Sequence, residues 1–164
     1  MHLCAEYGQA KLFENLKNSL NCELDIKNNL EETPFTVAAR EGRINILRLF
    51  YNKWPDQFNP DLRTQDGWTA FNYACINGFL NTIQFLYDKG VNVHTSDRIR
   101  RTSLHWAAKF NNYQVVELLL KLNLSLAKRD RAEMTPQEVC LKHGARESDA
   151  AFQAKIQSDK RKRR

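Results

Sequence analysis

The sequence predicts an all-α solenoid built from about five repeats. A seven-residue motif that begins with threonine recurs along the chain, and successive threonines lie 36, 33 and 33 residues apart. Apolar residues between the copies fall at helical spacing. A fixed period of this length is typical of stacked repeats, which bury their apolar faces against their neighbours. The copies are Thr33–Ala39, Thr69–Cys75, Thr102–Ala108 and Thr135–Leu141, and a shortened copy, His2–Ala5, opens the chain.

The best-preserved copy, Thr102–Ala108, reads TSLHWAA and closely resembles the T-P-L-H-x-A motif of ankyrin repeats. The resemblance covers almost the whole chain. It implies an ankyrin-repeat solenoid of stacked helix-turn-helix units with extended hairpin loops. We expect one domain over residues 1–158 and a basic, disordered tail over residues 159–164. The expected repeats are approximately 1–27, 28–63, 64–96, 97–129 and 130–158.

The first two repeats contain clear helix signals. A short helix is expected from His2 to Gly8, because glycine tolerates the left-handed conformation that ends a helix. The spacing of apolar residues predicts a second helix over roughly residues 10–20. In the next repeat, Thr33 can cap free backbone N–H groups, and Pro34 suits the first helical position.

The later repeats contain local departures from this pattern. Pro55 should end the outer helix of the second repeat. Three extra residues between positions 54 and 60 predict a longer loop there. Asn111 replaces the helix-ending glycine, which is the substitution that a left-handed position accepts readily. Ser148 and Asp149 stand where an apolar pair is expected, which predicts a polar C-terminal cap.

Composition and charge narrow the class of protein. With 42% hydrophobic and 27% charged residues, the chain is expected to fold. The net charge of +6 comes partly from the basic run at residues 160–164. Charged residues at Lys11, Glu14 and Lys17 argue against an apolar leader, and no apolar run is long enough to span a bilayer. We therefore expect a cytoplasmic protein, with the nucleus as an alternative if the basic run directs import.

The sequence gives little support for catalysis or metal binding. Cys140 and His143 have the spacing of half a metal site, but no second pair of ligands follows at a suitable distance. Cys22 with His94 or His143 could form a nucleophile pair, yet no third group is evident to orient it. Three cysteines, at positions 4, 75 and 140, stand where small buried residues are expected. We predict no enzyme activity and no cofactor.

Several polar residues have a structural explanation in the motif. By resemblance to ankyrin repeats, Thr102 and His105 hydrogen-bond each other and tie one repeat to the next. Thr36, Asn72 and Glu138 occupy the histidine position in other copies, so those junctions must be satisfied differently. Thr102 and Ser103 follow two arginines, as in a kinase site, but they also begin a packed helix. His94 lies where the family often has an asparagine that oxygenases hydroxylate.

The resemblance also places the candidate binding residues. In ankyrin repeats the hairpin tips and the exposed ends of the first helices line a concave groove. We expect its second half to be positive with aromatic anchors, because aromatic residues and arginine are enriched at interfaces. The alternative is that charged tips only solvate the edge. The candidates are Tyr7, Arg40, Trp68, Ile76, Asn77, Arg98, Ile99, Arg101, Lys109, Phe110, Arg131, Met134 and Lys142, with Trp68, Ile99, Arg101 and Phe110 at the centre.

These observations predict a non-enzymatic protein–protein interaction module. Its partner is expected to be an acidic or acidic-aromatic segment of an unidentified protein or peptide. One alternative is a targeting or regulatory domain of a larger enzyme, such as an acyltransferase, or of a channel. Another is that the basic face and tail bind nucleic acid or anionic lipid, although we do not expect nucleic acid as the partner. We expect a monomer.

Overall fold

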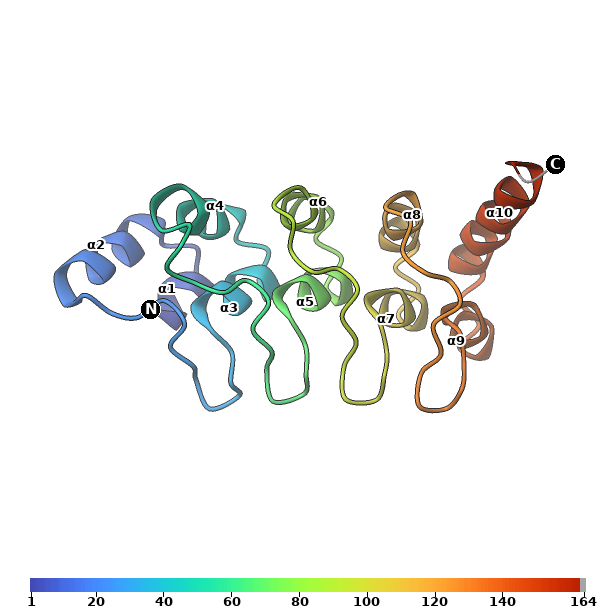
Figure 1. Cartoon of the computed structure of the whole chain (residues 1–164), viewed down its shortest axis with the longest axis horizontal. Coiled ribbons are helices and arrows are strands. Elements are labelled where there is room, and N and C mark those ends of the chain that lie inside the picture. Colours follow the sequence, from blue (N-terminus) through green and yellow to red (C-terminus); the bar gives the residue numbers. More distant parts are fainter. Residues whose placement is uncertain (163–164) are drawn as a thin grey trace. The chain divides into compact units, whose positions relative to one another are not determined.

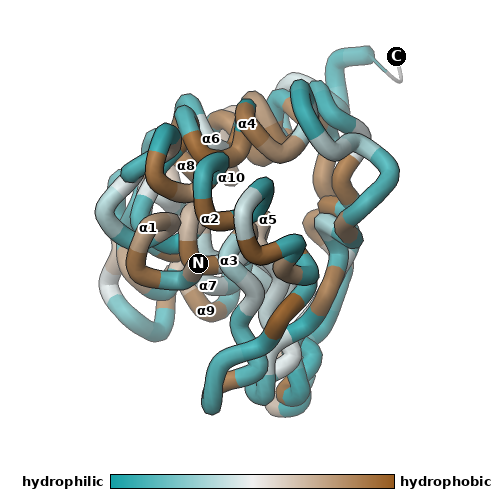
Figure 2. The backbone as a smooth tube through the Cα atoms, turned by 90° about the vertical axis from the view of Figure 1, so that its left-hand side faces the viewer, coloured by the Kyte–Doolittle hydropathy of each residue, from teal (hydrophilic) through white to brown (hydrophobic). Residues whose placement is uncertain are grey.

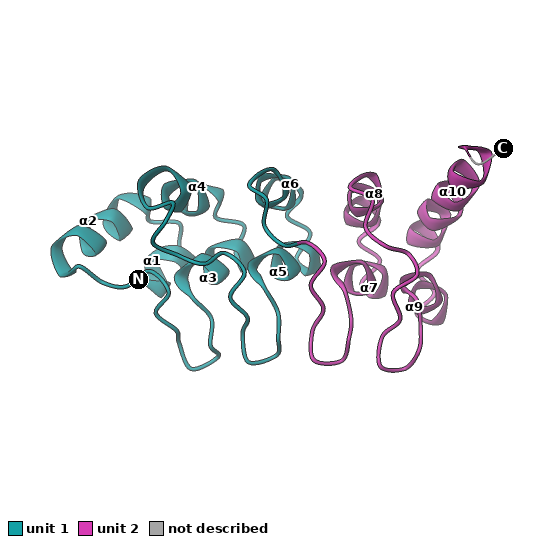
Figure 3. Ribbon diagram, in the orientation of Figure 1, with its two compact units in different colours: residues 1–92 teal, residues 93–164 magenta. Residues whose placement is uncertain are grey.

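The structure is a computed structural model that describes residues 1–162, and it contains two compact units. Unit 1 comprises residues 1–92 and unit 2 begins at Val93 (Figures 1 and 3). Both units consist of helix pairs joined by long loops. The described residues contain helices and one isolated bridge, between Ser96 and Thr102, but no longer strand. The predicted all-α class is therefore confirmed, whereas the single domain over residues 1–158 stays a prediction.

Unit 1 stacks helix pairs in two layers (Figure 1). One layer, which we call inner, contains α1, α3 and α5, and the outer layer contains α2, α4 and α6. Neighbouring helices within each layer pack against each other. The bounds are α1 His2–Glu6, α2 Ala10–Leu20, α3 Pro34–Arg40, α4 Ile44–Lys53, α5 Ala70–Ile76 and α6 Leu80–Asp88.

Unit 2 repeats the arrangement with four helices. Its inner helices α7 and α9 pack together, and its outer helices α8 and α10 do the same. The bounds are α7 Ser103–Lys109, α8 Tyr113–Lys121, α9 Pro136–Lys142 and α10 Arg146–Lys162. Helix α10 extends past Ser158, where we expected a disordered tail to begin. Its continuation from the packed segment accounts for the difference, and residues 163 and 164 of the predicted tail lie outside the described residues.

Threonine stands at the N-terminus of the inner helices α3, α5, α7 and α9, and the predicted cap at Thr33 is confirmed. The side chains of Thr33, Thr69 and Thr135 each accept a hydrogen bond from the backbone N–H three residues later. At α7, the backbone N–H of Thr102 donates to His105 Nδ1 at 3.2 Å. Such caps each stabilise a helix end by about 1 kcal/mol. They fix the point at which every hairpin loop becomes a helix.

One side chain closes each hairpin loop. The Oδ1 atoms of Asn28, Asp97 and Asp130 each accept hydrogen bonds from the backbone N–H groups two and four residues later, at 2.8–3.1 Å. The residue three positions after each has a left-handed backbone, with φ of 58° at Glu31, 63° at Arg100 and 58° at Glu133. These side-chain contacts add to backbone hydrogen bonds across each tip, such as that from the N–H of Asp97 to the carbonyl oxygen of Arg101.

The core of unit 1 is largely aromatic. Phe50 is fully buried, and its ring centroid lies 5.3 Å from those of Phe13 and Phe35 and 4.9 Å from that of Phe58. Phe58 belongs to the loop over residues 54–69, which is the longest of the chain, as the insertion predicted. The extra loop thus contributes an aromatic side chain to the core.

The core of unit 2 is mainly aliphatic. Leu104, Leu119 and Phe152 are fully buried. Ser148, which we expected on the polar surface of a cap, is also fully buried, so that prediction is wrong. Its hydroxyl lies 3.0 Å from Oδ1 of Asn111, which satisfies the buried group. Asn111 has φ of 54°, so its predicted left-handed conformation is confirmed.

Hydrophobic stretches follow the helices, and the end of α10 is hydrophilic (Figure 2). Among residues 1–162, no helix is both long enough and apolar enough to cross a membrane.

Candidate functional site

An aromatic and cationic cluster covers the end of α7 in unit 2. It comprises Arg101, Trp106, Lys109 and Phe110, and we call it the α7 cluster. The rings of Trp106 and Phe110 are stacked, with centroids 5.8 Å apart and an interplanar angle of 16°. Lys109 Nζ lies 4.7 Å from the centroid of Trp106 and 5.4 Å from that of Phe110. Helical spacing produces this arrangement, because residues three and four apart meet on one face.

Arg101 is fixed from two directions. Its Cζ lies 5.1 Å from the ring centroid of Trp106, and its Nε donates to Asp130 Oδ2 at 3.0 Å. Only 15% of its side chain is exposed, and the Asp130 side chain is almost fully buried. Burial opposes ionisation of Asp130, but the hydrogen bonds from Arg101 and from the backbone N–H groups of Met134 and Ala132 hold its pKa below the ordinary value. The pair therefore stays charged and fixes the guanidinium group in the cluster.

Trp106 lies at the centre of the α7 cluster, although it is not among the site residues predicted from the sequence. Its Nε1 donates to Asp97 Oδ2 at 2.8 Å, while its ring contacts the two cations and Phe110. The signal was present, because tryptophan occupies a helix position that holds tyrosine in the preceding repeat. Phe110 is 51% exposed, and Ile99, on the adjacent hairpin loop, is 37% exposed. The surface thus offers accessible apolar groups beside fixed cations.

His105 serves the fold rather than the surface. It is fully buried, with Nδ1 2.9 Å from the hydroxyl of Thr102 and Nε2 3.0 Å from the carbonyl oxygen of Met134. Since Nδ1 also accepts from the backbone N–H of Thr102, Nε2 carries the proton and donates to Met134. Burial lowers the pKa of His105, which favours this neutral form. The expected tie between consecutive repeats is therefore present.

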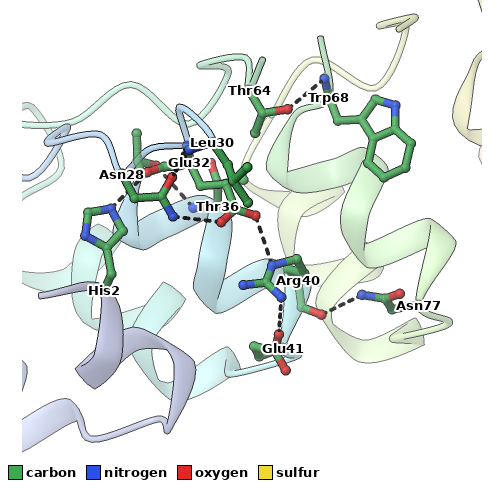
Figure 4. Close-up of polar contacts among 11 residues, drawn as sticks. His2, Asn28, Leu30, Glu32, Thr36, Arg40, Glu41, Thr64, Trp68 and Asn77 are labelled. Carbon is green, nitrogen blue, oxygen red and sulfur yellow. Dashed lines mark hydrogen bonds and ion pairs between the residues drawn. The ribbon is translucent and has the colours of Figure 1, made fainter. Parts of the chain in front are cut away.

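Unit 1 has an aromatic pair at the positions of Arg101 and Trp106. Trp68 lies directly before the capping threonine of α5, and Tyr73 lies on the helix. Their rings meet edge to face, with centroids 5.0 Å apart. The backbone N–H of Trp68 donates to the hydroxyl of Thr64 at 3.3 Å, which fixes the loop (Figure 4). Trp68 is half-buried and belongs to unit 1, whereas the other three residues of the expected groove centre belong to unit 2.

Intramolecular contacts engage Arg40, another candidate binding residue in unit 1. Arg40 Nε lies 3.0 Å from Glu32 Oε1 as an ion pair, although the N–H does not point at the oxygen well enough for a hydrogen bond. Its Nη1 donates to Glu41 Oε1 at 2.7 Å, and its carbonyl oxygen accepts from Asn77 Nδ2 at 2.7 Å (Figure 4). The buried Glu32 also accepts from Asn28. These contacts give Arg40 and Asn77 a structural role.

The remaining candidates lie at helix ends and hairpin tips. Tyr7 is 65% exposed after α1, and Ile76 is half-buried at the end of α5. Met134 is half-buried and accepts the bond from His105. The exposed basic candidates in unit 2 are Arg98, Arg131 and Lys142. The backbone N–H of Arg131 donates to the carbonyl oxygen of Ile99, which joins the two hairpin loops of unit 2.

Candidate chemical groups are buried or dispersed. Within residues 1–162, no group of three or more histidine, cysteine or acidic side chains could hold a metal ion. Cys140 is buried, and burial raises the pKa of its thiol to about 11, which keeps it protonated. Ser103 is fully buried, consistent with its expected place in a packed helix.

Comparison with known proteins places these features in a family. A protein-family model of ankyrin repeats, in three copies, matches residues 1–97 and 54–130. The chain is 26% identical to Notch homolog protein 1 of Xenopus tropicalis over 137 residues, which cover 83% of this chain and 5% of that protein. It is 30% identical to the probable 26S proteasome regulatory subunit p28 of Saccharomyces cerevisiae over 107 residues, 63% of this chain and 46% of that protein.

Inversin of Canis lupus familiaris is 32% identical over 83 residues, 51% of this chain and 8% of inversin. The chain thus spans less than half the length of each of these relatives. The family match, however, extends over most of the chain and agrees with the capped helix pairs of both units. The chain therefore belongs to the ankyrin-repeat family and is a protein–protein interaction module.

Proposed function

We propose that the chain binds an acidic-aromatic segment of a partner protein through the α7 cluster and the adjacent Ile99. The stack of Trp106 and Phe110 beneath Lys109 is the observation that supports this most strongly. A partner aromatic side chain can pack on the exposed face of Phe110, while carboxylates of the same segment pair with Lys109. Tryptophan, tyrosine and arginine are enriched among the hot spots of interfaces.

Preorganisation supports the proposal. Ordering a long side chain on binding costs about 0.5–1.5 kcal/mol. Asp130 and Trp106 already fix Arg101, and two rings already contact Lys109, so much of that ordering is complete before a partner arrives. The Asp130 carboxylate reduces the charge that Arg101 offers. Within residues 1–162, Lys109 contacts the two rings and forms no ion pair with an acidic side chain, so it is the main electrostatic determinant.

A direct test uses fluorescence anisotropy with a short labelled peptide of aspartate and glutamate that contains one phenylalanine and one tryptophan. The Phe110→Ala and Lys109→Glu variants should each weaken binding about tenfold or more, which corresponds to about 1.4 kcal/mol. A peptide with serine in place of both aromatics should bind the wild-type chain more weakly, because it cannot pack on Phe110.

Tyr113→Ala is a matched control, since Tyr113 is an aromatic residue of unit 2 that is 41% exposed but lies on the outer helix α8. It should bind the peptide like the wild-type chain. The proposal is wrong if Phe110→Ala and Lys109→Glu keep full affinity. A duplex or single-stranded oligonucleotide in the same assay tests the nucleic-acid alternative, which predicts strongly salt-dependent binding.

A further inference from the structure

A cavity lies between the two hairpin loops of unit 2, and none of the residues that line it belongs to the α7 cluster. Its volume is about 400 Å³, and a smaller hollow continues from it and shares three lining residues, His94, Thr102 and Lys128. The floor of that hollow is apolar, because it is lined by the buried side chains of Val93 and Leu124. The space is therefore open at a polar mouth and closed by an apolar base.

The side chain at one repeat position beside this cavity differs between the two units. In unit 1, Asp25 accepts a hydrogen bond from the backbone N–H of Asn59, and Asp61 accepts one from that of Asn92, both at 2.9 Å. Asp25 and Asp61 lie three residues before the residues that close their hairpin loops. His94 occupies that position before Asp97 in unit 2, and Ala127 occupies it before Asp130. Two carboxylates in unit 1 thus correspond to an imidazole and a methyl group in unit 2.

The mouth of the cavity is cationic. Arg100, Lys128 and Arg129 line it, together with one carboxylate, Glu133. Arg100 Nη1 lies 3.2 Å from Glu133 Oε1, and Arg129 Nη1 lies 3.3 Å from Glu138 Oε2, so both guanidinium groups already hold an acidic oxygen. All four side chains of these pairs are about half exposed or more. Such pairs contribute only about 0–1 kcal/mol, so a stronger anion can replace them at low cost.

We infer that this cavity binds a phosphate group, free or carried on a side chain. A phosphomonoester carries a charge of about −1.5 to −2 and three acceptor oxygens, whereas a carboxylate carries one charge. Guanidinium groups bind phosphate through paired hydrogen bonds. This inference does not rest on the proposed function, because it uses different residues on another part of unit 2.

The test is a titration of the full chain with three capped tripeptides that have glycine at both ends and phosphoserine, serine or glutamate in the middle. Amide NMR shifts of Ala127 and Lys128 report binding at the cavity. The phosphoserine peptide should bind about tenfold more tightly than the glutamate peptide, and the serine peptide should not shift these signals. Inorganic phosphate is a fourth probe, and its affinity relative to that of the phosphoserine peptide shows whether the ligand is free phosphate or a phosphorylated side chain.

Two exposed positions provide the variants. His94→Asp introduces the carboxylate that unit 1 has at this repeat position. It should weaken phosphopeptide binding about tenfold, because the added negative charge at the mouth repels the phosphate. Lys128→Ala should weaken it by a similar factor. Lys121→Ala, on the exposed face of α8, is the matched control and should have no effect. Since all three positions are exposed, the variants should keep the far-UV circular dichroism and melting temperature of the wild-type chain.

Two results would overturn the inference. One is phosphopeptide binding that neither His94→Asp nor Lys128→Ala weakens, or no binding at all. The other is equal affinity for the phosphoserine and glutamate peptides, which would show that the cavity does not select phosphate over a carboxylate.

Discussion

Units 1 and 2 place different chemistry at the same repeat positions. At the residue before the capping threonine and at the fourth residue of the inner helix, unit 1 has Trp68 and Tyr73, with ring centroids 5.0 Å apart. Unit 2 has Arg101 and Trp106 there, with the guanidinium carbon 5.1 Å from the ring centroid. The repeat therefore fixes the separation of the two side chains, while their identity determines whether the contact is neutral or cationic.

The two units also differ in formal charge. Residues 1–92 contain 9 lysines and arginines against 11 acidic residues, a formal charge of −2, whereas residues 93–164 contain 16 against 8, a formal charge of +8. The overall charge of +6 is thus a property of unit 2. Five of these basic residues form the run at residues 160–164, so residues 93–159 carry a formal charge of +3. The sign still differs from that of unit 1, which agrees with placing both proposed binding surfaces in unit 2.

Each unit also contains one buried carboxylate paired with arginine, but the direction is reversed. In unit 1 the acid, Glu32, is on the hairpin loop and Arg40 is on the helix. In unit 2, Arg101 is at the hairpin tip and Asp130 is on the next loop. Consequently the arginine of unit 2 also contacts the ring of Trp106. One ion pair therefore stabilises the fold and also positions a residue of the proposed binding surface.

The largest expected effect tests the difference between the two cores. Phe50→Ala in unit 1 should lower the free energy of unfolding by about 4 kcal/mol, because Phe50 is fully buried among three other phenylalanines. Leu119→Ala in unit 2 should cost about 3 kcal/mol, since a smaller side chain leaves a smaller cavity. Urea unfolding followed by circular dichroism measures both. A cost for Phe50→Ala below that of Leu119→Ala would show that the aromatic core is not the better packed.

The next effect concerns the two buried ion pairs. Asp130→Asn retains the oxygen that closes the hairpin loop, as Asn28 does in unit 1, but removes the charge opposite Arg101. It should lower the free energy of unfolding by about 3 kcal/mol, because a buried cation loses its partner. Glu32→Gln in unit 1 should cost about 2 kcal/mol, since Arg40 retains Glu41. Asp66→Asn, at an exposed position, is the control.

Acid adds a second readout for Asp130. The pKa of this carboxyl is lower in the folded chain than the ordinary value of 3.8, so folding favours its ionised form. The resulting stabilisation is complete above about pH 3.8 and is lost as the pH falls toward the folded-state pKa. Urea unfolding at a series of acidic pH values should show this loss in the wild-type chain. An equal loss in Asp130→Asn would show that another group is responsible.

Much of the frame could be predicted from the sequence because it depends on local signals. The Thr33 side chain caps its helix by accepting a hydrogen bond from the backbone N–H three residues later. Asn111 adopts the left-handed conformation that asparagine readily accepts. The motif register then indicated which residues form the helix ends. Both kinds of inference use contacts within one repeat, and the helix pairs they predicted are present.

The site could be predicted less well because its contacts join separate parts of the chain. Arg101 is mostly buried owing to Asp130, which lies 29 residues later, and no local pattern indicates that pair. Ser148 is polar in sequence but buried because Asn111, from the preceding repeat, accepts its hydrogen bond. The repeat spacing predicts which positions lie at the hairpin tips and helix ends. It does not predict which of those side chains bind other residues of the chain.

A smaller effect tests whether recognition is confined to unit 2. Trp68→Ala should lower the free energy of unfolding by about 1 kcal/mol, since it loses the edge-to-face contact with Tyr73 but stands at a half-buried position. It should leave the affinity for the acidic-aromatic peptide unchanged within about twofold, because Trp68 is not part of the α7 cluster. A tenfold change would correspond to about 1.4 kcal/mol. If Trp68→Ala weakens binding as much as Phe110→Ala, the recognised surface includes unit 1, as our sequence analysis expected.

An effect of about the same size tests the residue at the motif's histidine position, which differs between the two units. His105→Asn copies Asn72 of unit 1, so it should keep the cap with the preceding threonine but lose the bond to Met134, at a cost of about 1 kcal/mol.

The pKa of His105 is lower in the folded chain than the ordinary value of 6.5, so the unfolded chain binds the proton more tightly. Wild-type stability should therefore decline as the pH falls below about 6.5, until the folded-state pKa is reached. Thermal unfolding between neutral and mildly acidic pH measures this decline, and His105→Asn should lack its share. If the variant declines as steeply as the wild-type chain, His105 is not the titrating group, and the neutral, bridging histidine no longer distinguishes this repeat of unit 2 from the asparagine-capped repeat of unit 1.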